Sequence, residues 1–242
     1  MGLRVNTNII SMTAQRNLAS VTGRLEGNFQ RLSSGLRVAN AKDDPAGLGI
    51  SERLRSQIRS LGQASRNAQD GASLVQTAEG ALAEVNNNLT RMRELAIQSA
   101  NGTLADDDRA IIDDEFQALV AEINRIATTT NFNGIQLLDG SASSLDLQVG
   151  IESGQTITVN LEDTTSTALG LAAAGFDVTD VTNSVAALDI IDTATDSVTE
   201  ARGALGSTQN RLESTIRSIA NARENLAASE SRIRDVDVAA ET

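Results

Sequence analysis

A hydrophobic residue recurs at every seventh position along the last part of the sequence. This ladder has seven unbroken rungs: Ile191, Val198, Leu205, Leu212, Ile219, Leu226 and Ile233. A second ladder runs through Leu54, Leu61, Ala68, Val75, Leu82, Leu89 and Ala96, and a shorter one through Leu18, Leu25 and Leu32. Sustained seven-residue spacing is typical of long helices that pack side by side. Seven rungs in one register disfavour the alternative, which is chance alignment in an alanine-rich chain.

Helix-breaking residues divide this pattern into four predicted helices. The first is expected from about Asn6 to Leu32. The second begins at Pro45, where the preceding Asp residues supply an N-cap, and continues to about Ala100. A third runs from Asp106 to just before Asn131, and the last from about Asn183 to about Asp235.

Between the third and fourth predicted helices the hydrophobic spacing changes from seven to two. The alternating residues are Leu145, Leu147 and Val149, then, after a glycine-bounded turn, Ile157, Val159 and Leu161. This spacing predicts a β-hairpin near residues 141–163. A lone hairpin is marginally stable, so it must lie against the helices. We therefore predict a mainly α fold: an elongated antiparallel helical bundle, or coiled-coil rod, with one β-hairpin.

The composition removes most side chains on which enzyme chemistry and metal binding depend. The 242 residues include no His and no Cys, which excludes the commonest general base, thiol nucleophiles and zinc–thiolate sites. The acidic cluster at Asp106–Asp108 and Asp113–Glu115 lacks the glycine and alternating ligands of an EF-hand, and a solvated helix start is favoured. We predict that the chain is not an enzyme and has no cofactor and no metal.

Charge and hydropathy narrow the possible partners. The net charge of −12 disfavours nucleic-acid binding, and no apolar run approaches the roughly 20 residues of a membrane-spanning helix. The N-terminus shows no signal-peptide pattern. Asn88-Leu89-Thr90 and Asn101-Gly102-Thr103 match the glycosylation sequon, and we interpret both as incidental.

Several separated blocks resemble the bacterial flagellins. They are Arg4–Asn8, Arg31-Leu32-Ser33-Ser34-Gly35-Leu36-Arg37, Ala41-Lys42-Asp43-Asp44-Pro45-Ala46-Gly47-Leu48, Arg93–Asn101, Asn131-Phe132-Asn133-Gly134, Leu205–Arg211 and Glu230–Asp237. Long blocks in the right order, covering most of the chain outside 141–183, are more specific than any single motif.

The resemblance implies a filament subunit of the bacterial flagellum with three parts. These are an N-terminal coiled-coil arm at residues 1–40, a helical rod domain at 41–235, and the start of a mostly absent C-terminal arm at 236–242. The segment 163–182 stands in place of the outer variable domains. The implied partners are other flagellin subunits, the type III export apparatus and the filament cap, with an extracellular location. Without the C-terminal arm, we expect the isolated chain to be a soluble monomer.

Flagellin rod domains are also recognised by an innate immune Toll-like receptor. The resemblance places receptor-facing residues at Arg91, Leu95 and Glu115, and puts Thr90 where the best-recognised members carry Gln. Spacing alone favours a plainer interpretation, in which Arg91 and Arg93 with Glu94 form weak intrahelical pairs on a solvated face. The same interpretation applies to Arg232 and Arg234 with Asp235. The receptor-facing surface would also pack between subunits.

Three alternatives to a filament subunit stay open at this point. A hook–filament junction protein would share the helical ends, although the C-terminal block and the short middle favour flagellin. A flagellin with a catalytic insert would need more residues and a His. An adhesin or receptor ligand could coexist with the structural role.

Overall fold

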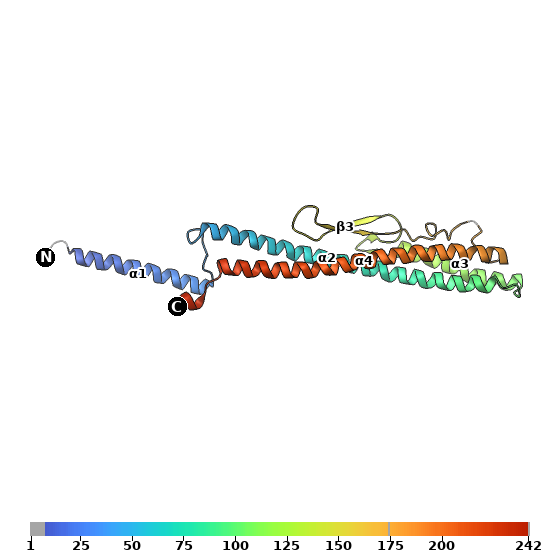
Figure 1. Ribbon diagram of the computed structural model, residues 1–242, viewed down its shortest axis with the longest axis horizontal. Helices are drawn as coiled ribbons and strands as arrows, with labels where there is room; N and C mark the ends of the chain where they lie inside the picture. The colour runs from blue at the N-terminus through green and yellow to red at the C-terminus, as the bar shows by residue number, and fades with distance from the viewer. Residues whose placement is uncertain (1–7, 174, 242) are drawn as a thin grey trace. The chain divides into compact units, whose positions relative to one another are not determined.

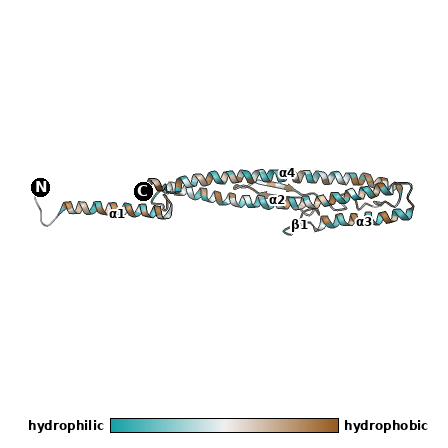
Figure 2. Cartoon of the chain, turned by 90° about the horizontal axis from the view of Figure 1, so that it is seen from below, coloured by the Kyte–Doolittle hydropathy of each residue, from teal (hydrophilic) through white to brown (hydrophobic). Residues whose placement is uncertain are grey.

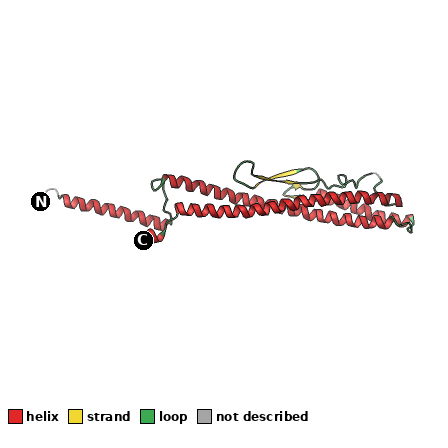
Figure 3. Ribbon diagram, viewed as in Figure 1, coloured by secondary structure: helices red, strands yellow, loops and turns green. Residues whose placement is uncertain are grey.

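The computed structural model describes residues 8–173 and 175–241 and is mainly helical (Figures 1 and 3). Its helices are α1 (Ile9–Ser34), α2 (Pro45–Ser99), α3 (Asp106–Thr129), α4 (Val181–Arg234) and α5 (Val238–Glu241). Its strands are β1 (Asn131–Phe132), β2 (Ile135–Gln136), β3 (Ser144–Gln148) and β4 (Thr156–Asn160). The predicted mainly α fold with a β-hairpin is confirmed, and the four long helices lie within a few residues of their predicted bounds. The predicted helix start at Asn6 lies outside the described residues.

The chain divides into two compact units, which are described separately. Unit 1 contains Met1–Ser60 and Asn221–Thr242, and unit 2 contains Leu61–Ala220. The domain boundaries expected from the sequence, at residues 40 and 236, stay a prediction.

Unit 2 is a bundle in which parts of α2 and α4 lie alongside α3 (Figures 1 and 2). The ladder residues that fall in this unit form its core. They are the buried Leu61, Ala68, Val75, Leu82, Leu89 and Ala96 on α2, and Ile191, Val198, Leu205, Leu212 and Ile219 on α4. On α3 the apolar face includes Ile112, Phe116 and Ile123, all buried. The heptads therefore identified the faces on which these helices pack.

The predicted hairpin is formed by β3 and β4, which pair antiparallel with Leu145 opposite Val159 and Leu147 opposite Ile157. Ile157 and Val159 are buried in the core that the helices supply, as a hairpin without a core of its own requires. Figure 3 shows the two strands lying along one side of the helices.

A second, shorter hairpin, which the sequence analysis did not predict, follows α3. Phe132 of β1 pairs with Ile135 of β2, so Asn133 and Gly134 are its two turn residues. Their φ angles are 50° and 81°, which is the left-handed backbone of a type I′ turn, the turn that Asn-Gly favours. Strands of two residues are too short to show a hydrophobic period.

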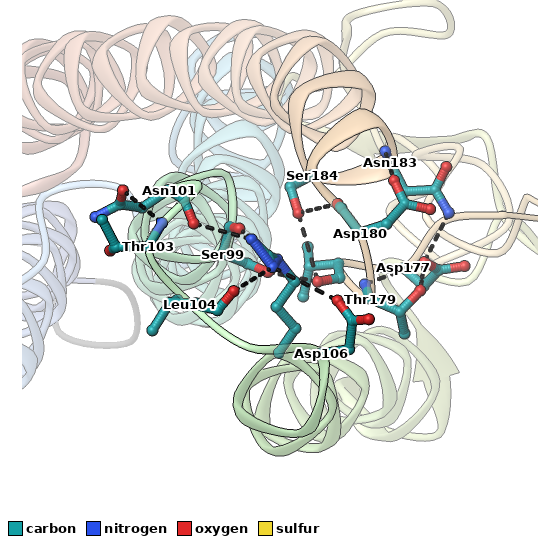
Figure 4. Close-up of polar contacts among 12 residues, drawn as sticks. Ser99, Asn101, Thr103, Leu104, Asp106, Asp177, Thr179, Asp180, Asn183 and Ser184 are labelled. Carbon is teal, nitrogen blue, oxygen red and sulfur yellow. Dashed lines mark hydrogen bonds and ion pairs between the residues drawn. The ribbon is translucent and has the colours of Figure 1, made fainter.

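The turn between α2 and α3 is closed by Arg109, a buried residue of the first turn of α3. Its guanidinium donates to three main-chain oxygens: Nε to Ser99 O (3.0 Å), Nη2 to Asn101 O (2.9 Å) and Nη1 to Leu104 O (3.0 Å). Figure 4 labels the three acceptor residues, Ser99, Asn101 and Leu104, and marks the hydrogen bonds with dashed lines. Carbonyl groups at a helix C-terminus lack partners within the helix. The Arg109 side chain supplies donors to such carbonyl groups at the end of α2 and in the turn that follows.

In unit 1 the chain leaving α1 is hydrogen-bonded to the end of α4. Arg37 N and Val38 N both donate to Arg234 O (2.7 and 3.3 Å), and Val236 N donates to Gly35 O (3.0 Å). Val38 is buried there. Gly35 has a φ of 71° and ends α1 as a left-handed C-cap, a conformation that glycine adopts without steric cost.

Helix α1 has no buried residue, although it carries the third ladder. Its exposed apolar side chains are Ile9, Ile10, Met12, Leu18, Val21, Leu25 and Phe29, and Figure 2 shows hydrophobic and hydrophilic residues mixed along it. None of the helices that the structure describes is long and apolar enough to cross a membrane. Within residues 8–173 and 175–241, no group of acidic side chains is arranged to hold a metal ion.

Candidate functional site: an ion-paired surface on α2 and α3

Arg91 and Glu115, two of the three predicted contact residues, meet across α2 and α3. Arg91 Nε and Nη2 lie 2.9 and 2.8 Å from Glu115 Oε1, and Arg91 Nη1 lies 3.0 Å from Glu94 Oε2. The side chains of Arg91 and Glu115 are 48% and 50% exposed. The hydrogen bond that Arg91 donates to Glu115, followed by the one that it donates to Glu94, raises the pKa of Arg91 above its ordinary value. The guanidinium therefore stays charged and is held between two carboxylates.

The third predicted contact residue, Leu95, lies elsewhere. It is 2% exposed and belongs to the core of unit 2. Leu95 is therefore not on the surface with Arg91 and Glu115, and its side chain supports α2 from inside. Thr90 is exposed beside them, where its Oγ1 donates to Asn86 O (2.9 Å).

Two exposed isoleucines extend this surface. Ile97 is 51% exposed and lies three residues after Glu94 on α2, and Ile111 is 70% exposed and lies four residues before Glu115 on α3. Residues three and four apart are neighbours on one helix face. We use "α2–α3 surface" for Arg91, Glu94, Ile97, Ile111 and Glu115. The sequence analysis missed both isoleucines, although each stands one position off the core pattern.

Other exposed ion pairs join α2 to α4 within unit 2. Arg93 Nε lies 2.8 Å from Asp192 Oδ1, and Arg202 Nη2 lies 2.8 Å from Glu79 Oε1. The α4 residue number falls as the α2 number rises, so the two helices are antiparallel. The hydrogen bond from Arg93 lowers the pKa of Asp192. These pairs were also missed, because their partners are 99 and 123 residues apart in the sequence.

Nothing in this arrangement supplies a catalytic group. The paired Arg and carboxylate side chains are partly exposed, and the contacts they make are with one another. The surface consists of an exposed charged network with two exposed apolar side chains beside it.

Comparison with known proteins gives the family. Residues 5–143 match the model of the bacterial flagellin N-terminal helical region, and residues 188–242 match that of the C-terminal helical region. A flagellin from Halalkalibacterium halodurans is 52% identical over 237 residues, covering 98% of this chain and 87% of the relative. The flagellin of Bacillus subtilis is 42% identical over 271 residues, covering 99% of this chain and 89% of the relative. The crystal structure of Bacillus cereus flagellin is 35% identical with a TM-score of 0.59, and covers 68% of this chain and 94% of that one.

The fold thus defines a helical structural protein, and the two matched regions identify its kind. The chain belongs to the bacterial flagellin family. It is a structural subunit of the flagellar filament and serves motility. The family predicted from the sequence blocks is confirmed.

Proposed function

We propose that this chain assembles into the filament by packing the apolar face of α1 against other copies, after export through the type III apparatus and beneath the filament cap. The observation that carries the proposal is the exposure of the apolar face of α1 that contains the ladder residues Leu18 and Leu25. Leu18, Leu25 and Phe29 are 71, 55 and 63% exposed on one face of a 26-residue helix. An apolar stripe of this kind has its role in helix–helix contact.

The test is co-assembly of the chain into growing filaments. The chain, with an epitope tag in an exposed loop, is produced in flagellated cells, and immunogold electron microscopy locates the tag. We expect label along the filaments and in the extracellular fraction. Leu25→Glu should remove the label, because it places a charge in the apolar contact. Ser20→Glu is the matched control, since it adds the same charge to the opposite, exposed face of α1.

Absence of label with the unsubstituted chain would refute the proposal. Equal labelling by Leu25→Glu and Ser20→Glu would refute the part assigned to the α1 ladder.

A second proposed role is recognition of the α2–α3 surface by an innate immune Toll-like receptor. The supporting observation is that Arg91 and Glu115, which the family resemblance picks out, form one exposed network on two helices. Leu95 would act from the core by holding the backbone of α2 in place.

The receptor proposal is tested with a reporter cell line and purified protein. Arg91→Ala and Leu95→Ala should each weaken signalling, the first by loss of a contact and the second by loss of packing. Arg125→Ala is the control, since Arg125 forms a similar exposed pair with Glu122 (2.6 Å) within α3. An unchanged response to both test variants would remove this surface from the function of the chain.

A further inference from the structure

The turn after α2 contains an Asn-Gly pair in an unusual set of contacts. Asn101 O accepts hydrogen bonds from Leu104 N (3.3 Å) and from the guanidinium Nη2 of Arg109 (2.9 Å). The side-chain Oδ1 of Asn101 accepts one from Thr103 N (3.3 Å), drawn in Figure 4. Asn101 and Gly102 are both exposed. Neither the core nor the α2–α3 surface uses these contacts.

We infer that Asn101 is a site of spontaneous deamidation that the fold itself promotes. The main-chain N of Gly102 attacks Cγ of Asn101, and the bond from Cγ to Nδ2 breaks. Ammonia leaves with the proton that the Gly102 amide gives up, and a five-membered succinimide remains. Water then attacks one of the two carbonyl carbons and opens the ring, producing Asp or isoaspartate at position 101. The balance is one water consumed and one ammonia released, with no oxidation or reduction.

Each developing negative charge in this reaction faces a donor that is already in place. The oxygen held by Arg109 belongs to the same amide group as Gly102 N, so the guanidinium stabilises the charge that forms when this amide loses its proton. The Thr103 N–H stabilises the oxyanion that forms on Asn101 Oδ1 during attack. Donors fixed before the reaction are the most effective form of electrostatic stabilisation. Arg109 is fixed, because it is 4% exposed and makes three hydrogen bonds.

The turn does not fix the dihedral angles of Asn101 itself. The Leu104 N to Asn101 O bond makes Asn101 the first residue of a β-turn, and turn geometry fixes the dihedral angles of the two central residues only. Gly102 is not among the glycines with a positive φ, and no atom lies within 4 Å of the position its Cβ would occupy. The space on the side-chain side of Gly102 is therefore open.

The chain provides an internal control in its second Asn-Gly pair, Asn133-Gly134. Asn133 is the first central residue of the type I′ turn, with φ fixed at 50° by the pairing of Phe132 with Ile135. The accompanying ψ of such a residue is about 30°, which directs the next nitrogen away from the side chain. Ring closure there would require breaking the hairpin. We expect Asn133 to stay intact in the folded protein.

The experiment follows both sites in one sample by peptide mapping with mass spectrometry. Folded protein is aged at neutral pH, beside an identical sample in concentrated urea. In the folded sample Asn101 should convert at least about tenfold faster than Asn133, a margin below the roughly 10²–10³ that one prepositioned donor contributes. In urea the two sites should convert at similar rates. Equal rates in the folded protein, or faster loss of Asn101 in urea than in the fold, would overturn the inference.

Two variants separate the parts of the argument. Gly102→Ala fits the open space around the turn and should slow conversion of Asn101 at least about tenfold while leaving helix content unchanged. Arg109→Met, with its helix content verified by circular dichroism, should bring the rate at Asn101 down to that in urea. A folded Arg109→Met protein that deamidates as fast as the unsubstituted chain would refute the role given to the guanidinium.

Discussion

Replacing Arg109 by methionine tests whether one side chain holds the α2–α3 turn. The substitution keeps most of the buried aliphatic part of the side chain and removes the guanidinium, so three hydrogen bonds to main-chain carbonyls are lost together. The acceptors differ in what replaces the lost donor. Ser99 is fully buried, whereas Asn101 is exposed and Leu104 is partly buried.

The expected loss of stability follows from that difference. A buried polar group left without a partner costs about 1–3 kcal/mol, and we assign about 2 kcal/mol to the Ser99 carbonyl. The carbonyls of Asn101 and Leu104 exchange arginine for water, at about 0.5 kcal/mol each, the lower end for a net hydrogen bond. The sum is about 3 kcal/mol. For a protein of this size that is a fall in melting temperature of roughly 6–12 °C.

The assay is thermal and urea unfolding followed by circular dichroism at the helix signal. Arg125→Met is the matched control on the same helix, because Arg125 is 61% exposed and pairs with the near neighbour Glu122. That control should stay within about 0.5 kcal/mol of the unsubstituted protein. Should Arg109→Met also stay within that limit, the reasoning about buried carbonyl groups would be refuted.

Two further predictions concern the ion pairs and the glycines of α2. The folded pKa of Asp192 is lowered by Arg93, so the stabilising effect of the pair is present above the unfolded pKa and is lost as the pH falls below about 4. Asp192→Asn should therefore lower the melting temperature at pH 7 and reduce the fall in melting temperature between neutral pH and pH 3. An unchanged fall in melting temperature would count against the pair. Gly71→Ala should destabilise the protein by about 1 kcal/mol because the new Cβ meets the Leu147 side chain. Gly80→Ala, with open space around it, should stabilise the protein by about 0.5–1 kcal/mol. Urea unfolding measures both changes, and equal effects would contradict the packing argument.

The heptads predicted the helices well because seven-residue spacing records which face of a helix is apolar. They do not record what covers that face. Leu82 and Leu205 are 1% and 3% exposed, but Leu18 and Leu25, in the same kind of pattern, are largely exposed. The β3–β4 hairpin was equally predictable, because its apolar and polar residues alternate. The β1–β2 hairpin was not, because two residues per strand cannot show a period.

The candidate surface was predictable only in part. Arg91 and Glu115 are 24 residues apart in sequence, and their pairing depends on how α3 packs against α2. Leu95 lies in the core because three helices and a hairpin bury a wider face of α2 than a two-helix seam would. Arg109 was missed because it follows three aspartates, a pattern typical of solvated helix starts, and its acceptors are main-chain oxygens that leave no trace in the sequence.

The pairs that join α2 to α4 have a consequence for the order in which unit 2 folds. Arg93 and Asp192 are 99 residues apart, and Glu79 and Arg202 are 123 apart, whereas the acceptors of Arg109 lie within 10 residues of it. The entropy lost on closing a chain segment grows with its length, and distant contacts form slowly. We expect α2 and α3 to close on each other first as a local helical hairpin. Helix α4 would then pack last, so its apolar ladder residues would stay exposed to solvent until α2 and α3 have packed together.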